Sequence, residues 1–175
     1  MIELLSPAGS RASLEAAVQA GADAVYMGFG AFNARRSAKN FTDEEFADAV
    51  AYCHLRGVRV FLTLNTLLTD RELPQAAETL HKASDMGVDA VLVQDWGALT
   101  LAQAVAPDLP IHASTQMSLF TAGGHAGRKV WVWSGWCWPG NWAGRTLPAS
   151  AKAAARRSRC SSTGRCACAI PASAP

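Results

Sequence analysis

Neutral hydrogen-bonding side chains and one carboxylate stand at the ends of three apolar stretches. Asn65 ends VRVFLTLN, Gln94 and Asp95 end VDAVLVQD, and Ser114 and Gln116 lie in LPIHASTQMS. Amide and hydroxyl groups suit a planar substrate such as a nucleobase or a peptide group, and a carboxylate could accept a proton or orient a cation. Asn65 and Asp95 could instead cap following helices. We treat all five as candidate substrate-binding residues.

A second candidate binding segment is the basic stretch FNARRSAKNF. It places Arg35, Arg36 and Lys39 between Phe32 and Phe41. Basic residues interleaved with aromatic ones suit phosphate contacts and base stacking. We expect this loop on the active face, so Arg35 and Arg36 are candidate substrate contacts. The alternative is an ordinary solvated loop.

The remaining nucleophilic and metal-ligating residues form no catalytic motif. No histidine pair has metal-ligand spacing, and neither a serine-hydrolase elbow nor a zinc-protease helix motif occurs. His54 and His81 fall on predicted helices, where we expect surface positions, and His112 falls inside a predicted strand. Cys53 is expected to pack in the core. The residues therefore assign no catalytic group and no metal site.

Strand and helix patterns alternate through residues 1–124 and would position these side chains. Strands are expected at 2–6, 23–30, 58–65, 88–95 and 109–118, and helices at 11–22, 42–57, 69–87 and 96–107. Thr42 and Glu45 form a capping box, and Gly57 and Gly87 end helices. The stretch AGADAVYMG recurs in kind as MGVDAVLVQ. These features predict an α/β fold of the (β/α) TIM-barrel-like type, of which residues 1–124 supply only the N-terminal half, because about eight units close a barrel.

Residues 125–175 have a different composition. All 14 acidic residues and 8 of the 16 basic ones precede residue 125, so the ending carries 8 basic residues and no acidic one. Five of the six tryptophans lie within VWVWSGWCWPGNWAG. A tryptophan-lined ligand groove, a membrane-surface element and a basic nucleic-acid-binding tail are functional interpretations of this ending.

We favour a frameshift near Lys129. Starting each codon at the third base of the preceding one permits Leu-Gly-Leu-Glu-Arg-Val-Val-Leu-Ala-Arg-Glu-Leu-Gly, a helix end followed by a strand. The same shift further on permits Phe-Ile-His-Gly-Ala-Leu-Cys-Met-Arg-Tyr-Ser-Gly-Gln-Cys. One constant shift thus restores ordinary protein sequence at two distant places. The ending is accordingly expected to be an irregular, non-native basic tail.

The chain resembles the U32 peptidase family, the collagenase-like peptidases. The resemblance rests on ELLSPAGS, AGADAVYMGFGAFNARRSAKNFT, VFLTLNTL, AVLVQDWG and IHASTQMSLF, and it covers residues 1 to about 128. In the shifted frame, Gly-Ala-Leu-Cys followed by Gly-x-Cys is similar to the family signature. The resemblance implies a cytoplasmic barrel long described as a peptidase. It also implies relatives that hydroxylate RNA bases or a quinone precursor without molecular oxygen, using an iron–sulfur cluster held by cysteines of the second half.

Those cysteines have no counterpart here, because Cys160, Cys166 and Cys168 lie out of frame. We therefore expect no cofactor in this chain and an inactive N-terminal fragment of a U32-type enzyme whose intact form binds RNA or peptide. Without a leader or a long apolar run, a cytoplasmic location and no membrane partner are expected. Open barrel edges could cause self-association. The alternatives are a non-enzymatic basic-tailed α/β module that binds RNA, and a different complete small α/β protein.

Overall fold

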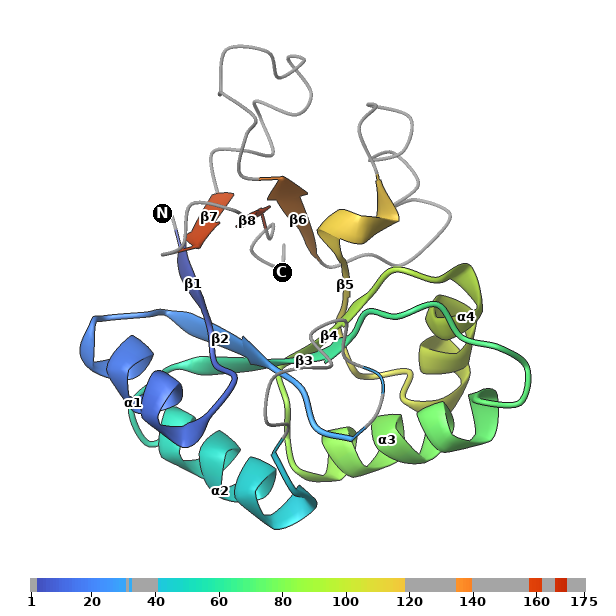
Figure 1. Cartoon of the computed structure of the whole chain (residues 1–175), viewed down its shortest axis with the longest axis horizontal. Helices are drawn as coiled ribbons and strands as arrows, with labels where there is room; N and C mark the ends of the chain where they lie inside the picture. The colour runs from blue at the N-terminus through green and yellow to red at the C-terminus, as the bar shows by residue number, and fades with distance from the viewer. Residues whose placement is uncertain are drawn as a thin grey trace.

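The alternation of strands and helices is confirmed in the computed structural model, which describes residues 3–30, 32, 41–118, 135–139, 158–161 and 166–169. Figure 1 shows the elements along the chain. They are β1 (Glu3–Pro7), α1 (Arg11–Gln19), β2 (Ala24–Met27), α2 (Asp43–His54), β3 (Arg59–Leu64), α3 (Leu73–Asp85), β4 (Ala90–Val93), α4 (Trp96–Val105), β5 (Ile111–Ala113), the 3-10 turn η1 (Thr115–Met117), β6 (Gly135–Pro139), β7 (Ser158–Ser161) and β8 (Cys166–Ala169).

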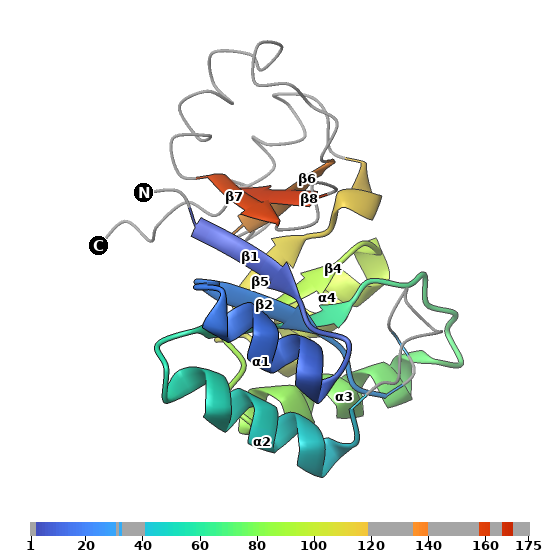
Figure 2. The same cartoon turned by 60° about the vertical axis from the view of Figure 1, so that its left-hand side comes forward.

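The first five strands form a parallel sheet in chain order, with each strand hydrogen-bonded to the next. Helices α1 to α4 lie together on the outer face of this sheet (Figures 1 and 2). Parallel neighbours joined by helices place all five carboxyl ends at one edge. The α/β, barrel-like prediction for this half of the fold is therefore confirmed.

Local capping fixes where the helices begin and end. The Thr42 hydroxyl accepts the Glu45 N–H at 3.2 Å while the Glu45 carboxylate accepts the Thr42 N–H at 3.0 Å, which is the predicted capping box. Gly57 follows α2 with φ +69°, a conformation that favours glycine. Helix α3 begins later than predicted, because the Glu72 carboxylate accepts both the N–H and the hydroxyl of Thr69 and holds a turn there.

Two apolar layers share the strands by alternation. Outward side chains such as Val60, Leu62 and Val91 pack against the helices in the larger core. Inward side chains form a smaller cluster inside the ring of strands, made of Leu5, Ala24, Phe61, Ala90 and Leu92, with Tyr26 packed against it. The inner layer thus fills the inside of the ring of strands next to their carboxyl edge.

The recurring Asp–Ala pair before β2 and β4 joins adjacent strands. Asp23 donates its N–H to the Leu4 carbonyl at 2.9 Å, and its carboxylate accepts the Leu4 N–H at 2.6 Å. Asp89 makes the same two bonds to Val60, at 2.9 and 2.7 Å. We call each arrangement an aspartate clamp. The sequence repeat therefore marks a repeated structural device.

Three short strands from the ending complete the ring of strands. β6 pairs with β5 and β7 pairs with β1, both in parallel, and β8 lies antiparallel between β6 and β7. The resulting order is β1-β2-β3-β4-β5-β6-β8-β7, a closed barrel. The open edges expected from the sequence differ from this arrangement, because β7 and β6 pair with the backbone groups of β1 and β5. The expected irregular tail differs only at these three strands, since the rest of the ending lies outside the described residues. β7 and β8 also depart from the parallel helix-linked pattern of the first five.

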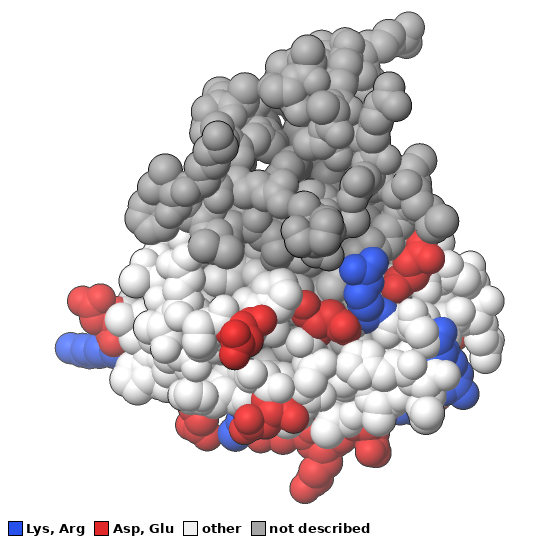
Figure 3. All heavy atoms as spheres, turned by 180° about the vertical axis from the view of Figure 1, so that it is seen from behind, with Lys and Arg blue, Asp and Glu red and all other residues white. Residues whose placement is uncertain are grey.

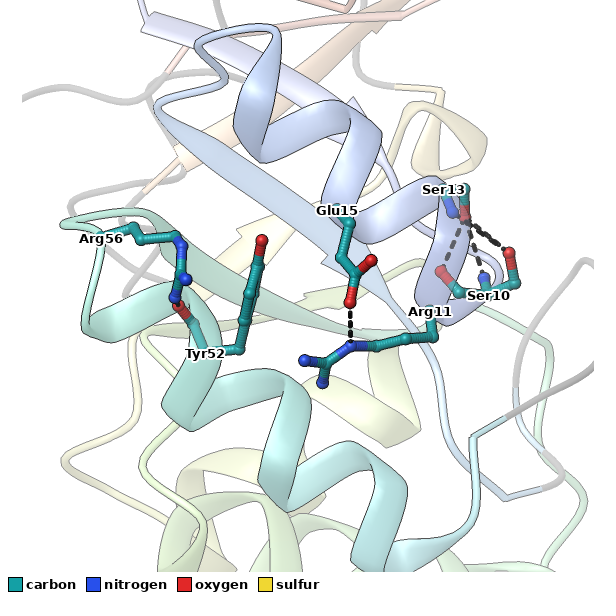
Figure 4. A network of polar contacts seen from close by, with 6 residues as sticks. All are labelled: Ser10, Arg11, Ser13, Glu15, Tyr52 and Arg56. Carbon is teal, nitrogen blue, oxygen red and sulfur yellow. Dashed lines mark hydrogen bonds and ion pairs between the residues drawn. The ribbon is translucent and has the colours of Figure 1, made fainter.

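A polar network lies where α1 and α2 meet on the outer surface (Figure 4). The guanidinium carbons of Arg11 and Arg56 lie 4.5 and 3.7 Å from the centroid of the Tyr52 ring. Arg11 also pairs with Glu15 at 2.7 Å, which raises the pKa of its guanidinium. The network lies on the outer surface of the helix layer and links two neighbouring helices.

Candidate functional site at the carboxyl edge of the strands

Asn65 and Gln94 come together at the carboxyl edge. The register pairs Leu64 of β3 with Val93 of β4, so the two amides follow neighbouring strands at the same level. Both residues are half-buried. Each side chain type offers a donor and an acceptor, and the pair is suited to recognising the edge of a planar polar group.

Asp95 accepts hydrogen bonds from the backbone of two neighbouring loops. Its Oδ1 accepts the Gly97 N–H at 2.7 Å, and its Oδ2 accepts the Leu68 N–H at 2.9 Å. The first bond caps α4, and the second ties the β3–α3 loop to the start of that helix. The helix-cap alternative considered from the sequence describes these contacts, and Asp95 acts by positioning the loops around it.

Ser114 and Gln116 lie beyond β5, which ends at Ala113, earlier than predicted. The backbone turns into η1 there, and the buried Ser114 hydroxyl accepts the Gln116 N–H at 3.4 Å. Gln116 is exposed. Both residues stay at the carboxyl edge, but their side chains no longer alternate along a strand, because the turn changes the side-chain direction.

The inner wall below this edge contains polar groups that the sequence interpretation did not select. His112 is 4% exposed, and its ring meets Phe61 edge-on at 4.9 Å between centroids. Burial, with a smaller contribution from the Arg59 charge, lowers the pKa of His112 to about 3. The Thr63 hydroxyl is buried and has no hydrogen-bond partner. Strand alternation from Phe61 to Thr63 was the signal that could have placed this threonine on the inner wall.

The aromatic part of the predicted basic loop is used for packing. Phe32 and Phe41 are 4% and 6% exposed, and Phe41 meets Phe46 at 6.4 Å between ring centroids. Their rings therefore do not offer a stacking surface, contrary to the expectation. Arg35 and Arg36 lie outside the described residues, as does Lys39.

Cysteine and metal chemistry have little support among the described side chains. Cys53 is buried on α2, as predicted, and burial raises the pKa of its thiol to about 11. No group of three or more His, Cys, Asp or Glu residues in the described ranges could hold a metal ion. These side chains do not fit an iron–sulfur cluster. None of the helices described is long and apolar enough to cross a membrane.

Comparison with known proteins gives a family match. Residues 9–126 match the model of peptidase family U32. An uncharacterized protease of Methanocaldococcus jannaschii is 41% identical over 68% of this chain, which covers 29% of that protein. A 23S rRNA 5-hydroxycytidine synthase of Escherichia coli is 42% identical over 69% of this chain, which covers 18% of that enzyme. The chain thus spans less than a third of the length of either relative.

A solved structure gives the same fold. The structure of a U32 peptidase superposes with a TM-score of 0.57 at 22% identity, covering 71% of this chain and 53% of that one. At this identity the likeness concerns the fold alone. It agrees with the parallel sheet and its outer helices.

Proposed function

The chain belongs to peptidase family U32, and from this membership we propose that it carries the substrate-binding half of an enzyme that modifies an RNA base. The amides of Asn65 and Gln94, with Ser114 and Gln116 beyond β5, hold the base edge. The described residues of this half hold no metal-binding group, and we infer that the catalytic groups lie outside them. The whole activity therefore belongs to a longer protein, and this chain by itself is inactive.

The observation that carries this proposal is the neutral polar character of the carboxyl edge. Asn65 and Gln94 directly follow β3 and β4 at the same level, and the nearby carboxylate of Asp95 accepts two backbone N–H groups. A hydrolytic peptidase needs an activated nucleophile, a metal-bound water or a water activated by paired carboxylates. The described side chains favour recognition of a base over cleavage of a peptide, and the rRNA-modifying relative supports the same choice.

The proposal also concerns residues 129–175, which we infer to be encoded out of frame. The family match ends at residue 126, close to Lys129, which supports this inference. Sequencing the coding DNA around that codon tests it. A downstream frame that continues the family sequence is expected, and the same ending encoded in several homologous genes would contradict it.

A second candidate function has its own support. The 8 basic and no acidic residues of 125–175 favour a non-enzymatic module that binds RNA through phosphate contacts. Such binding is nearly independent of base identity and depends strongly on salt. It would leave the strand-end amides without a role.

Titration of the full chain with a labelled single-stranded RNA distinguishes these functions. We expect binding that Gln116→Ala weakens by about fivefold, the loss of roughly one hydrogen bond. Gln75→Ala, which removes an exposed amide from α3, is the matched control and leaves binding unchanged. An unlabelled peptide substrate should not compete.

The opposite results are equally informative. Competition by peptide, with no RNA binding, contradicts the RNA proposal and favours a peptidase. RNA binding that Gln116→Ala leaves unchanged and that disappears without residues 129–175 supports the basic-tailed module.

A further inference from the structure

Two of the large exposed apolar side chains stand at the carboxyl edge. Among the described residues, Leu55, Leu67 and Trp96 are 84%, 76% and 50% exposed. Leu67 follows β3 and Trp96 begins α4 directly after β4, whereas Leu55 ends α2 at the opposite edge of the sheet. We call Leu67 and Trp96 the apolar patch. Trp96 thus exposes part of a large aromatic ring next to the candidate site.

Asp95 joins the backbone next to Leu67 to the backbone next to Trp96. Asp95 accepts the Leu68 N–H at 2.9 Å through Oδ2 and the Gly97 N–H at 2.7 Å through Oδ1. Leu67 and Trp96 are each one residue away from this bridge. A Cβ at Gly97 would lie 3.4 Å from Oδ1 of Asp95, an ordinary van der Waals contact distance. The patch is therefore built on a fixed backbone.

The chemistry around the apolar patch suits a base. Asn65 and Gln94 precede Leu67 and Trp96 by two residues each, at the same edge. The charged residues nearest in sequence are acidic, Asp70 and Asp95, and they repel phosphate. Figure 3 shows both acidic and basic side chains on one face of the described part of the chain. An indole face stacks on any base and needs no charge.

We propose that Trp96 is the stacking platform for an unpaired nucleobase of the substrate RNA, with Leu67 at its rim. The proposal rests on the RNA-modifying function proposed above and assigns it a positioning residue. The base lies on the indole and turns its polar edge to the side-chain amides of Asn65 and Gln94, which follow β3 and β4. Phosphate contacts fall elsewhere on the chain.

The test uses the full chain and two labelled strands of equal length, a single-stranded RNA and its abasic counterpart. Trp96→Ala is expected to weaken RNA binding by about 5- to 100-fold, the range for loss of one stacked base. Trp96→Phe retains a ring and most of the affinity. Leu55→Ala removes a more exposed apolar side chain at the opposite edge and leaves binding unchanged.

Two further readouts separate stacking from a general effect. The abasic strand should bind weakly and equally to wild type and Trp96→Ala. The slope of affinity against salt should be unchanged by Trp96→Ala, because stacking releases no counterion. Circular dichroism melts of each variant verify folding, and rescue by Trp96→Phe is required.

Each failure has a distinct meaning. RNA binding by Trp96→Ala equal to that of wild type overturns the platform and leaves the proposed function standing. No RNA binding by wild type overturns both. A loss of self-association in Trp96→Ala with unchanged RNA binding overturns the platform and makes the apolar patch a protein interface.

Discussion

At the scale of single residues, the polar side chains near the carboxyl edge differ in whether they already have hydrogen-bond partners within the chain. Both carboxylate oxygens of Asp95 accept backbone N–H groups, and the Ser114 hydroxyl accepts the N–H of Gln116. Thr63 keeps a buried hydroxyl without a partner, which is costly in an apolar wall.

His112 leads to a prediction about pH. Burial lowers its pKa from 6.5 to about 3, so between these values the unfolded chain binds a proton that the folded chain does not. The free energy of unfolding therefore falls as the pH drops below 6.5, by up to about 1.4 kcal/mol per pH unit. Urea unfolding of wild type and His112→Leu at several pH values measures the slope, which should be smaller in the variant.

The exposed His81→Asn variant is the control for this series. It is expected to keep the wild-type pH dependence, because His81 is exposed on α3. Equal slopes in wild type and His112→Leu would mean that the imidazole is not buried in its neutral form.

At the scale of elements, the aspartate clamps set the spacing of neighbouring strands. Asp23 joins β2 to β1, and Asp89 joins β4 to β3. Each clamp follows a helix and a glycine, so one local sequence ends the helix, turns the chain and fixes the next strand. His54 of α2 also contacts Asp89 at 3.0 Å, which connects the helix layer to the second clamp.

Removing a clamp should destabilise the fold. Asp89→Ala leaves the partly buried Val60 N–H without its carboxylate acceptor, and we expect a loss of about 1–3 kcal/mol in the free energy of unfolding. Asp89→Asn keeps an oxygen acceptor and should lose less. Denaturant unfolding provides the measurement.

Asp85→Ala, at the exposed end of α3, is the matched control and should change stability by less than about 0.5 kcal/mol. A clamp variant as stable as this control would show that the backbone pairing alone sets the strand spacing.

At the scale of the whole molecule, closure of the ring depends on the unusual ending. β5 and β1 would be edge strands without β6 and β7. Exposed edges of a parallel sheet are templates for pairing between chains. The ending therefore has a physical effect on the first half whatever reading frame encodes it.

Truncation tests this effect. A chain that stops at residue 128 lacks β6, β7 and β8, and we expect it to self-associate through β1 and β5. Sedimentation velocity at several protein concentrations measures the association, with the full chain as reference. A truncated chain that stays monomeric and melts in one sharp transition would show that the five-strand sheet protects its own edges.

The sequence by itself determined the elements of the first half, because capping residues, glycines and apolar periodicity act locally. Thr42 with Glu45 and the glycine after α2 gave helix ends that the structure confirms. Tertiary structure alone decided the uses of the polar and aromatic residues. Asp95 bridges two loops, Phe41 packs inward and Trp96 stays exposed. Each of these outcomes depends on which strands become neighbours. Neighbouring strands are far apart in the chain, so local sequence patterns do not reveal them.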